Sequence, residues 1–354
     1  MKTKCLILLV MLVNITKAQD TLKLSPAWLE SEKINVSEYV SRIDYIPIEY
    51  NMPLSLNDRL YTGNDFVMFG KNIYWGNNYS QSISFADINA KDNCSSVING
   101  ELYYLSLRDS IVSIYKNGRN LAGKINLPQG IDRIHITDRG LLIGYRSRNI
   151  AVDDKGLREL YVYDIFNKEL LLSHHSLSKS SCELNKQWFP FLYNLIWDYK
   201  GHIYYYENIT QKVYEIVQIK DSGVRLVERF IIDMSPYAMS FDDALAMGDK
   251  DYTFGRSMHI MRVLEVANGI IFTISYDKKI KTIVFNKSNL SIAGVSTLTA
   301  DLDEIASGEL YLQWNRLSQR GKIAAKKYFR SHNMSPSYKP TTYIIPVYDG
   351  FEEY

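Results

Sequence analysis

The side chains in this sequence that could recognise a ligand are few, and they lie far apart along the chain. Arg146 and Arg148, in the stretch YRSRN, are two residues apart, so in an extended segment they share a face and could hold a carboxylate or phosphate together. Trp75 and Trp188 lie beside polar loops, where an exposed ring could stack on a sugar or a peptide group. His202 opens the aromatic strand HIYYYE and could face a central channel. These five residues are the candidate ligand-binding residues, and ordinary packing or exposure to solvent is the competing explanation for each.

Linear motifs for catalysis or metal binding are missing from the sequence. It has no His-Glu-x-x-His zinc motif, no Gly-x-Ser-x-Gly nucleophile motif and no glycine-rich phosphate loop. The neighbouring His174 and His175 would point to opposite faces of a strand. The acidic runs at 152–155, 242–251 and 301–304 lack the ligand spacing of a calcium loop. We therefore predict no catalytic residues, no cofactor and no metal site, although residues from separate elements could still assemble around a divalent cation.

The first 18 residues have the features of a secretory signal peptide. Lys2 and Lys4 precede an apolar run from Cys5 to Val13, and a small-x-small pattern ends at Ala18. The apolar run is shorter than the roughly 20 residues that cross a bilayer, and no later stretch approaches that length. We therefore expect cleavage after Ala18, export to the periplasm or the extracellular space, and a mature chain without a transmembrane segment.

The composition of the mature chain narrows its partners. Removing residues 1–18 takes away three lysines and leaves 38 basic against 39 acidic residues, so the mature chain is nearly neutral. Nucleic-acid binders usually carry a basic surplus, which argues against a nucleic-acid partner. Cys94 and Cys182, the cysteines of the mature chain, either pair after export or are buried free thiols. Tyrosine is frequent, at 27 residues, and we expect most of these rings to pack between sheets.

A short unit of turn, strand, turn and strand recurs along the chain. One copy is WDYKGHIYYYENITQKVYEIV at 197–217, in which a glycine turn precedes an aromatic strand, and a polar turn leads to an alternating strand. The glycines that mark the five copies are Gly70, Gly100, Gly140, Gly201 and Gly269. The first strand of each copy is apolar almost throughout, whereas a strand with one face exposed to solvent would alternate apolar and polar residues. This pattern indicates small sheets that are covered on both sides.

Small sheets of this kind bury both faces when they stack radially, as in a β-propeller. The segments SRIDYIPIEY at 41–50 and TTYIIPVYDG at 341–350 both read as strands, and their pairing would close the ring and remove an open edge. Five internal copies and one blade from both ends predict a six-bladed, all-β propeller with short helical insertions, and seven blades are the alternative. No linker divides the chain, so we expect one domain over residues 19–354.

The same segments resemble a known family. The stretch VSRIDYIPIEY, the repeated glycine-strand units, QWFPFLYNLIWDYKGHIYYYENITQKVYEI and KPTTYIIPVYD are similar to the secreted six-bladed propellers of Gram-negative bacteria that are related to the NHL and TolB-like propellers. The resemblance covers most of residues 23–350. It implies a propeller fold and an exported protein, and it supplies no catalytic residues.

Two segments depart from the strand pattern. Residues 237–266 contain a short helical stretch before Gly248, and NRLSQRGKIAAKKYFRSHN at 315–333 is basic and helical in part. The basic segment is either a solvated helix face or a surface that docks on a partner or on anionic groups.

These observations favour an exported, non-enzymatic propeller that binds a peptide, a protein partner or a glycan on the face formed by its blade-connecting loops. Such loops gather around one depression, so a composite site needs no linear motif. The alternative is a lyase or hydrolase acting on a carbohydrate or lactone, with an axial divalent cation. Convergence of His135, His202 or His259 with carboxylates at one end of the ring would favour the enzyme. A third hypothesis, a structural or assembly subunit, predicts a large exposed apolar patch.

Overall fold

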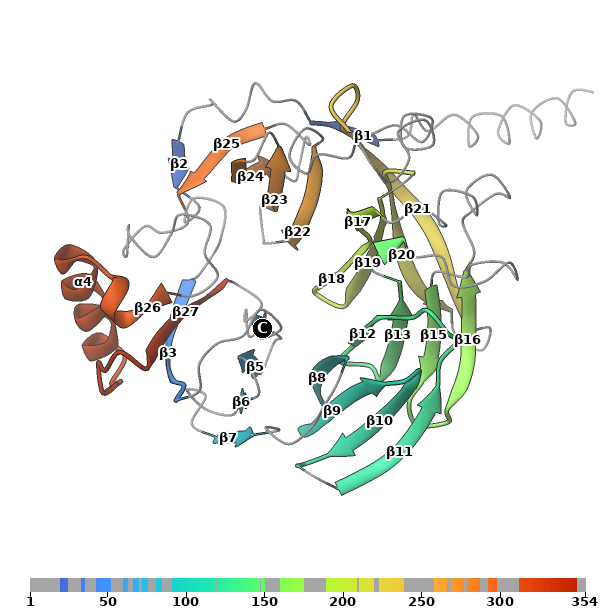
Figure 1. Ribbon diagram of the computed structural model, residues 1–354, viewed down its shortest axis with the longest axis horizontal. Coiled ribbons are helices and arrows are strands. Elements are labelled where there is room, and N and C mark those ends of the chain that lie inside the picture. The colour runs from blue at the N-terminus through green and yellow to red at the C-terminus, as the bar shows by residue number, and fades with distance from the viewer. Residues whose placement is uncertain are drawn as a thin grey trace, which may run out of the picture.

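The computed structural model of the chain describes residues 20–24, 33–35, 43–51, 60–62, 66–69, 72–75, 81–84, 91–118, 120–146, 148–149, 160–174, 189–208, 210–219, 223–238, 258–265, 269–276, 279–286, 292–297 and 312–348. The described part is built mostly of β-strands. Five antiparallel sheets, each with four consecutive strands, are arranged around a common centre like the blades of a propeller (Figure 1). The fold class is therefore all-β, with a propeller arrangement of five blades.

The blades are numbered by their order along the chain. Within each blade, the first strand lies nearest the centre of the ring and the fourth lies farthest from it. Blade 1 contains β4 (Leu60–Thr62), β5 (Phe66–Phe69), β6 (Asn72–Trp75) and β7 (Gln81–Ser84). Blade 2 contains β8 (Asp92–Ile98), β9 (Glu101–Arg108), β10 (Ile111–Lys116) and β11 (Asn120–Asn126). Blade 3 contains β12 (Arg133–Ile136), β13 (Leu141–Tyr145), β15 (Leu160–Asp164) and β16 (Glu169–His174). Blade 4 contains β18 (Leu195–Tyr199), β19 (His202–Glu207), β20 (Lys212–Ile219) and β21 (Gly223–Asp233). Blade 5 contains β22 (His259–Glu265), β23 (Gly269–Tyr276), β24 (Lys279–Asn286) and β25 (Ile292–Thr297).

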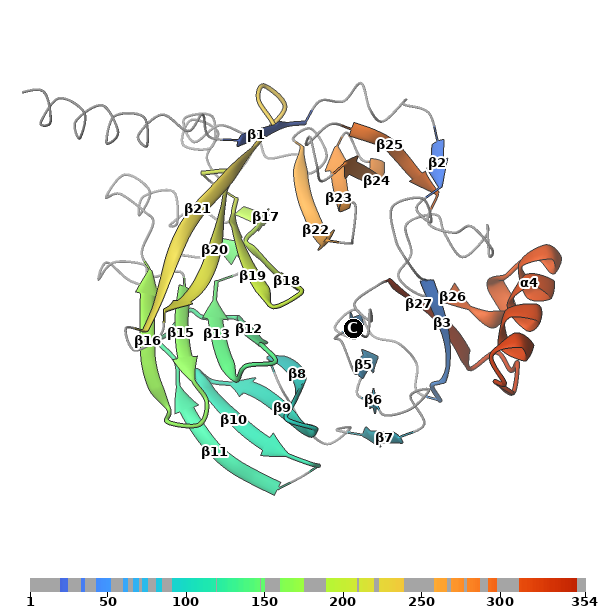
Figure 2. The same ribbon diagram turned by 180° about the vertical axis from the view of Figure 1, so that it is seen from behind.

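The N-terminal segment adds a fifth strand to two of these blades. Strand β1 (Asp20–Lys23) pairs in parallel with β21, and β2 (Lys33–Asn35) pairs in parallel with β25. Leu22 and Leu24 are buried in the cluster that also contains residues of blades 4 and 5. This segment, which we call the N-terminal strap, therefore covers the outer edges of two neighbouring blades (Figure 2).

A three-stranded sheet, the terminal sheet, joins the two ends of the described chain. Strand β3 (Ile43–Glu49) pairs antiparallel with β27 (Thr342–Tyr348), and β27 also pairs with β26 (Leu312–Gln313). The predicted pairing of 41–50 with 341–350 is thus confirmed. The predicted count of six blades is not, because this sheet has three described strands and only five sheets have the four-stranded form. A further two-stranded sheet pairs β14 (Arg148–Asn149) with β17 (Phe189–Tyr193).

The helical elements follow β26. The 3₁₀ helix η5 (Trp314–Arg316) leads to α4 (Gln319–Ser331), which confirms the helix expected within 315–333. Among the described residues, no helix combines the length and apolar character that crossing a bilayer requires. The signal peptide at 1–18 and the helical stretch expected before Gly248 lie outside the described residues.

All five repeated units in the sequence correspond to paired strands of the five blades. In blades 2 and 4, a tight turn joins the first and second strands through Asn99-Gly100 and Lys200-Gly201. Both residues of each turn have positive φ, with +77° at Gly100 and +75° at Gly201. This geometry matches the twist of the flanking strands, and glycine adopts it without a steric penalty.

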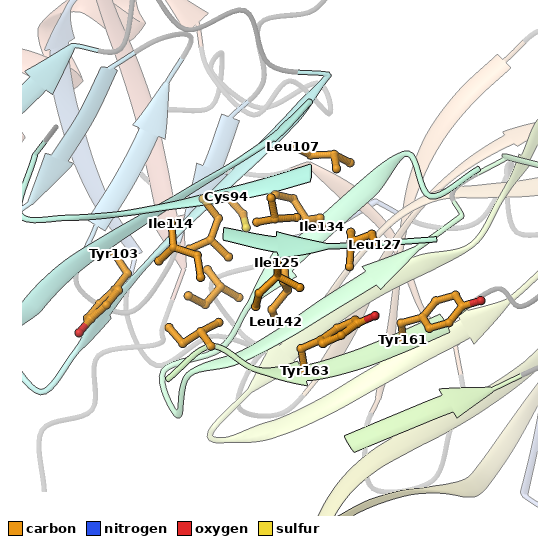
Figure 3. Packing of buried hydrophobic residues seen from close by; sticks show 14 of the residues in the cluster. Cys94, Tyr103, Leu107, Ile114, Ile125, Leu127, Ile134, Leu142, Tyr161 and Tyr163 are labelled. Carbon is orange, nitrogen blue, oxygen red and sulfur yellow. The ribbon is translucent and has the colours of Figure 1, made fainter. Parts of the chain in front are cut away.

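Apolar side chains fill the space between neighbouring blades. The cluster between blades 2 and 3 includes Leu107, Ile125, Ile134 and Leu142 (Figure 3). Tyr103, Tyr161 and Tyr163 pack in the same cluster, as expected for most of the tyrosine rings. Cys94 is also buried there as a free thiol, whereas Cys182, the other cysteine of the mature chain, lies outside the described residues. Burial raises the pKa of this thiol well above its usual value.

Polar contacts also connect the blades. Asp92 of blade 2 is buried, and its carboxylate accepts hydrogen bonds from the Ile134 backbone N–H at 2.8 Å and from Arg133 Nη1 at 3.1 Å, both in blade 3. Trp197 Nε1 of blade 4 donates to Glu265 Oε2 of blade 5 at 3.0 Å, and both side chains are buried. These bonds help to fix blade 2 relative to blade 3 and blade 4 relative to blade 5.

Candidate functional site

The topology divides each blade into two ends. Since the four strands alternate in direction, the innermost strand begins and the outermost strand ends at the same end of the blade. We call this the entry end; it also carries the loop between the second and third strands. The opposite end carries the turns between the first and second strands and between the third and fourth.

Polar side chains gather at the entry end between blades 3 and 4, which lie side by side in both ribbon views (Figures 1 and 2). Arg146 follows β13, and His174 ends β16 of blade 3. Asn194 precedes β18, Glu207 ends β19, and Asn208 follows it in blade 4. We call these five residues the seam cluster. All except His174 are at least 95% buried, which is unusual for such polar residues.

Asn194 makes hydrogen bonds through both ends of its amide, one to blade 3 and one within blade 4. Its Nδ2 donates to the Arg146 carbonyl oxygen at 2.9 Å, and its Oδ1 accepts from the Asn208 backbone N–H at 3.0 Å. The first bond joins blade 3 to blade 4, and the second holds the start of the β19–β20 turn. Asn194 is therefore a structural member of the cluster.

Glu207 lies in the same seam with 1% of its side chain exposed. Thr210 donates a hydrogen bond from Oγ1 to Glu207 Oε2 at 2.5 Å. His174 Nε2 lies 3.8 Å from Glu207 Oε1, and the His174 ring packs 5.6 Å from the Tyr214 ring. Burial raises the pKa of Tyr214 to about 12, and the nearby charges of Glu207 and Glu228 add to the shift.

Some buried polar atoms at the entry end have no hydrogen-bond partner among the described residues. Two belong to the seam cluster, His174 Nε2 and Asn208 Nδ2. Tyr206 Oη and Ser275 Oγ, near the entry ends of blades 4 and 5, are also buried without a hydrogen-bond partner. Leaving a buried donor or acceptor unsatisfied costs about 1–3 kcal/mol, so native proteins usually satisfy it with water, an ion or a ligand. The entry end of blades 3 to 5 therefore has unused capacity to hydrogen-bond a polar ligand.

The five predicted residues are not brought together at one place. Arg146 belongs to the seam cluster, where it is 2% exposed rather than solvated. Arg148 follows on β14, whose partner strand β17 leads into Asn194 at the same end. Trp188 lies outside the described residues. Trp75 ends β6, at the opposite end of blade 1, and packs half-buried against a cluster that contains Met68 and Tyr104.

His202 is also at the opposite end, where it begins β19. Its Nδ1 is 2.6 Å from Glu215 Oε1, and its side chain is 59% exposed. Glu215 Oε2 also accepts from Arg229 Nε at 2.5 Å. Burial alone would raise the pKa of Glu215, but the hydrogen bonds from His202 and Arg229 lower it below its ordinary value. His202 therefore holds a buried carboxylate at the rim of the blade, with Arg229 as the second partner.

Aromatic rings continue inward from His202. The His202 ring stacks on Tyr204, and Tyr204 stacks on Trp197 with ring centroids 5.3 Å apart. Burial raises the pKa of Tyr204 to about 12, with additional contributions from the charges of Glu265 and Glu215. The three rings connect the exposed imidazole to the boundary with blade 5.

The histidines of blades 3 to 5 that the structure describes do not all lie at one end. His135 Nε2 lies 3.8 Å from Asp198 Oδ2 at the opposite end, while His259 begins β22 at the entry end. The described residues contain no group of three or more His, Cys, Asp or Glu side chains that could hold a metal ion. Three histidine–carboxylate contacts are present among the described residues: His202–Glu215 and His135–Asp198 at the opposite end, and His174–Glu207 at the entry end.

Asn194, Glu207 and Asn208 were not recognisable as functional candidates from the sequence pattern. Each is a single polar residue at the end of an apolar strand, in the stretches YNLIW and YYENIT. Such residues are usually turn formers, and only the packing of blade 3 against blade 4 buries them. The one usable signal was their position, since they flank the strands of the best-defined repeat.

Comparisons with known proteins support the fold. No protein-family model matches the chain, and no match is found among curated proteins. A proposed exported protein from Bacteroides fragilis NCTC 9343 aligns over 93% of this chain and 99% of its own, with a TM-score of 0.56 and 10% identity. A member of the DUF4221 family from Bacteroides vulgatus ATCC 8482 aligns over 91% and 99%, with a TM-score of 0.41 and 10% identity. The extracellular domain of a proposed one-component system from B. thetaiotaomicron aligns over 69% and 30%, with a TM-score of 0.36 and 10% identity.

At this level of identity, the likeness to the Bacteroides fragilis protein extends to the fold over nearly the whole of both chains. It carries no information on which residues bind or react. The narrower relation to NHL and TolB-like propellers does not follow from any of the three structures.

Proposed function

We propose that this protein is an exported, non-enzymatic β-propeller that binds a peptide, a protein partner or a glycan at the entry end of its blades. The proposal includes a ring in which the terminal sheet is the sixth blade, within one domain over residues 19–354, as in the NHL and TolB-like propellers. The observation that supports this proposal is the set of buried polar atoms at the entry end of blades 3 to 5 that have no hydrogen-bond partner among the described residues. A ligand that bonds to them recovers free energy that the unliganded protein loses.

The chemistry of these atoms favours a ligand rich in oxygen acceptors. Asn208 Nδ2 is a donor, and Tyr206 Oη can donate. Glycans and acidic peptides both carry several hydroxyl, carbonyl or carboxylate oxygens that could accept these hydrogen bonds. Arg148 remains a candidate because β14 lies at the same end, and Trp188 remains one because it directly precedes β17 in the sequence. Trp75 and His202 would belong to a separate surface.

Export is proposed on two grounds. Residues 1–18 have a signal-peptide pattern, and the Bacteroides fragilis protein with the same fold is itself described as a proposed exported protein. The proposal covers both the periplasm and the extracellular space.

The competing function is a lyase or hydrolase acting on a carbohydrate or lactone. One observation favours it: Glu215 contacts Nδ1 of His202, whose side chain is 59% exposed, and a histidine oriented by a carboxylate in this way is a common form of general base. However, Arg229 occupies the second oxygen of Glu215, so this carboxylate already has two partners within the protein. Binding is therefore the preferred function.

The test is thermal unfolding of residues 19–354 against soluble glycans, acidic and neutral peptides and divalent ions, with and without EDTA. A ligand at about a hundred times its dissociation constant should stabilise the protein by about 2.7 kcal/mol. Stabilisation by a glycan or a peptide in the presence of EDTA is the expected result. A loss of stability with EDTA that one metal restores would instead support the enzyme.

A further inference from the structure

The exposed face of α4 is a second surface whose composition differs from the rest of the molecule. The helix begins after Ser318, whose side chain accepts a hydrogen bond from the Gly321 N–H at 3.2 Å. It lies at the periphery of the ring, outside β3 and β27, in both ribbon views (Figures 1 and 2). The helix therefore has one face toward the terminal sheet and one face away from the protein.

The inner face of α4 is fixed by packing. Ala325 and Phe329 are fully buried in a cluster with Tyr45 and Ile344 of the terminal sheet. Tyr328 packs edge-on against Tyr45 at 4.9 Å and donates from Oη to Asp44 Oδ1 at 3.0 Å. The helix is thus held rigidly, and its outer residues point in a defined direction.

The outer face is cationic around one exposed aliphatic residue. Arg320, Ile323, Lys327 and Arg330 follow the 3-4-3 spacing of one helical stripe, and all four are exposed. Ile323, at 68% exposed, is the most exposed large hydrophobic residue in the described part of the chain. Lys326, beside the stripe, lies over the rings of Trp314 and Tyr338.

No acidic side chain offsets this charge within the helix. The sequence QRGKIAAKKYFRS of α4 contains five basic residues and no Asp or Glu. In the described part of the chain, Lys327 and Arg330 have no ion pair with a carboxylate. Because the mature chain as a whole is nearly neutral, this concentration of charge is local to α4.

We infer that this face of α4, centred on Ile323, docks the protein on an anionic phospholipid surface. Lys and Arg side chains near such a surface are each attracted to it, and a convex helix brings several of them into contact at once. Ile323 is placed to enter the boundary between headgroups and acyl chains. A membrane surface can contact the protruding side of a helix without having a groove to receive it. An acidic protein partner would need a groove that is complementary to the helix. The inference is independent of the ligand proposed for the entry end, which is on other blades.

The experiment is co-sedimentation of the mature protein with vesicles of phosphatidylcholine alone or mixed with phosphatidylglycerol. We expect binding to the mixed vesicles only, and release as the salt concentration rises. The double variant Lys327→Gln/Arg330→Gln should bind about thirtyfold more weakly. Ile323→Ser should also weaken binding while leaving its salt dependence in place.

The matched control is Lys124→Gln/Arg225→Gln, which removes the same charge from exposed positions on blades 2 and 4. It should bind as the wild type does, and all variants should keep the wild-type melting temperature because the substituted side chains are exposed. Failure to bind mixed vesicles, or equal loss in both double variants, would overturn the inference. Binding to polyglutamate but not to vesicles would also overturn it, and would assign the face to an acidic protein.

Discussion

Asn194 and Asn208 lie next to each other at the entry end of blade 4, yet their substitution should have opposite effects on the unliganded protein. Asn194→Ala removes two buried hydrogen bonds and should lower the free energy of unfolding by about 2 kcal/mol. Asn208→Ala removes an amide nitrogen that has no partner among the described residues, so stability should be unchanged or slightly higher. Urea unfolding of the two variants beside the wild type measures both effects. Equal destabilisation by both would mean that Asn208 Nδ2 is satisfied in the native protein.

Glu215 should make stability depend on pH in the acid range. Hydrogen bonds from His202 and Arg229 hold the folded-state pKa of Glu215 below its ordinary value of 4.5. A carboxylate with a lowered pKa stabilises the fold above its unfolded-state pKa, and this contribution is lost as pH falls through the folded-state value. Glu215→Gln should therefore be less stable than the wild type at neutral pH and should lose less stability below about pH 4.5. Parallel stability curves for the two proteins between neutral pH and pH 3 would refute this role for Glu215.

Single residues were the hardest feature to predict from the sequence. The two arginines in YRSRN were expected to share one exposed face, but Arg146 is buried because β13 carries it into the seam with blade 4. His202 was a candidate for facing a central channel, with packing or solvent exposure as the competing explanation, and the structure places it in contact with Glu215 across the sheet. A residue's partners here come from neighbouring strands or from the next blade, and a linear pattern does not specify them.

The N-terminal strap is the element whose contribution to stability is easiest to isolate. Leu22 is fully buried between β21 and blade 5, while its neighbour Lys23 is exposed. Leu22→Ala should lower the free energy of unfolding by about 3 kcal/mol, because it leaves a cavity in a packed core. Lys23→Ala should change it by less than about 0.5 kcal/mol. Urea unfolding of both variants is the measurement, and a negligible effect of Leu22→Ala would show that the strap does not contribute to folding.

Strands with a strong pattern were predictable, and short edge strands were not. The aromatic strands after Gly100 and Gly201 were recognised because a positive-φ turn and a continuous apolar run mark their start. Strands β1 and β2 have only four and three residues, and they pair in parallel with strands about 200 residues or more away in the sequence. No local turn or alternation specifies such pairing, so the strap was missed.

The arrangement of the whole molecule follows from one repeated unit. Blades 2, 3 and 4 each bury one face on the blade before and one on the blade after, which explains why their inner strands are apolar on both sides. The sequence predicted this architecture and the pairing of β3 with β27, but it counted the terminal sheet as a full blade. That sheet has three described strands and is covered by α4, so its outer side is built differently from the other five.

The most direct test of the proposed function compares ligand responses at the two ends of the blades. Melting temperatures of the wild type, Asn208→Ala and His202→Ala should be measured with the same glycans and peptides in the presence of EDTA. The proposal predicts that at least one of these ligands stabilises the wild type and His202→Ala equally, and that Asn208→Ala loses most of this response. A response that persists in Asn208→Ala and disappears in His202→Ala would contradict the proposal and place the functional site at the opposite end.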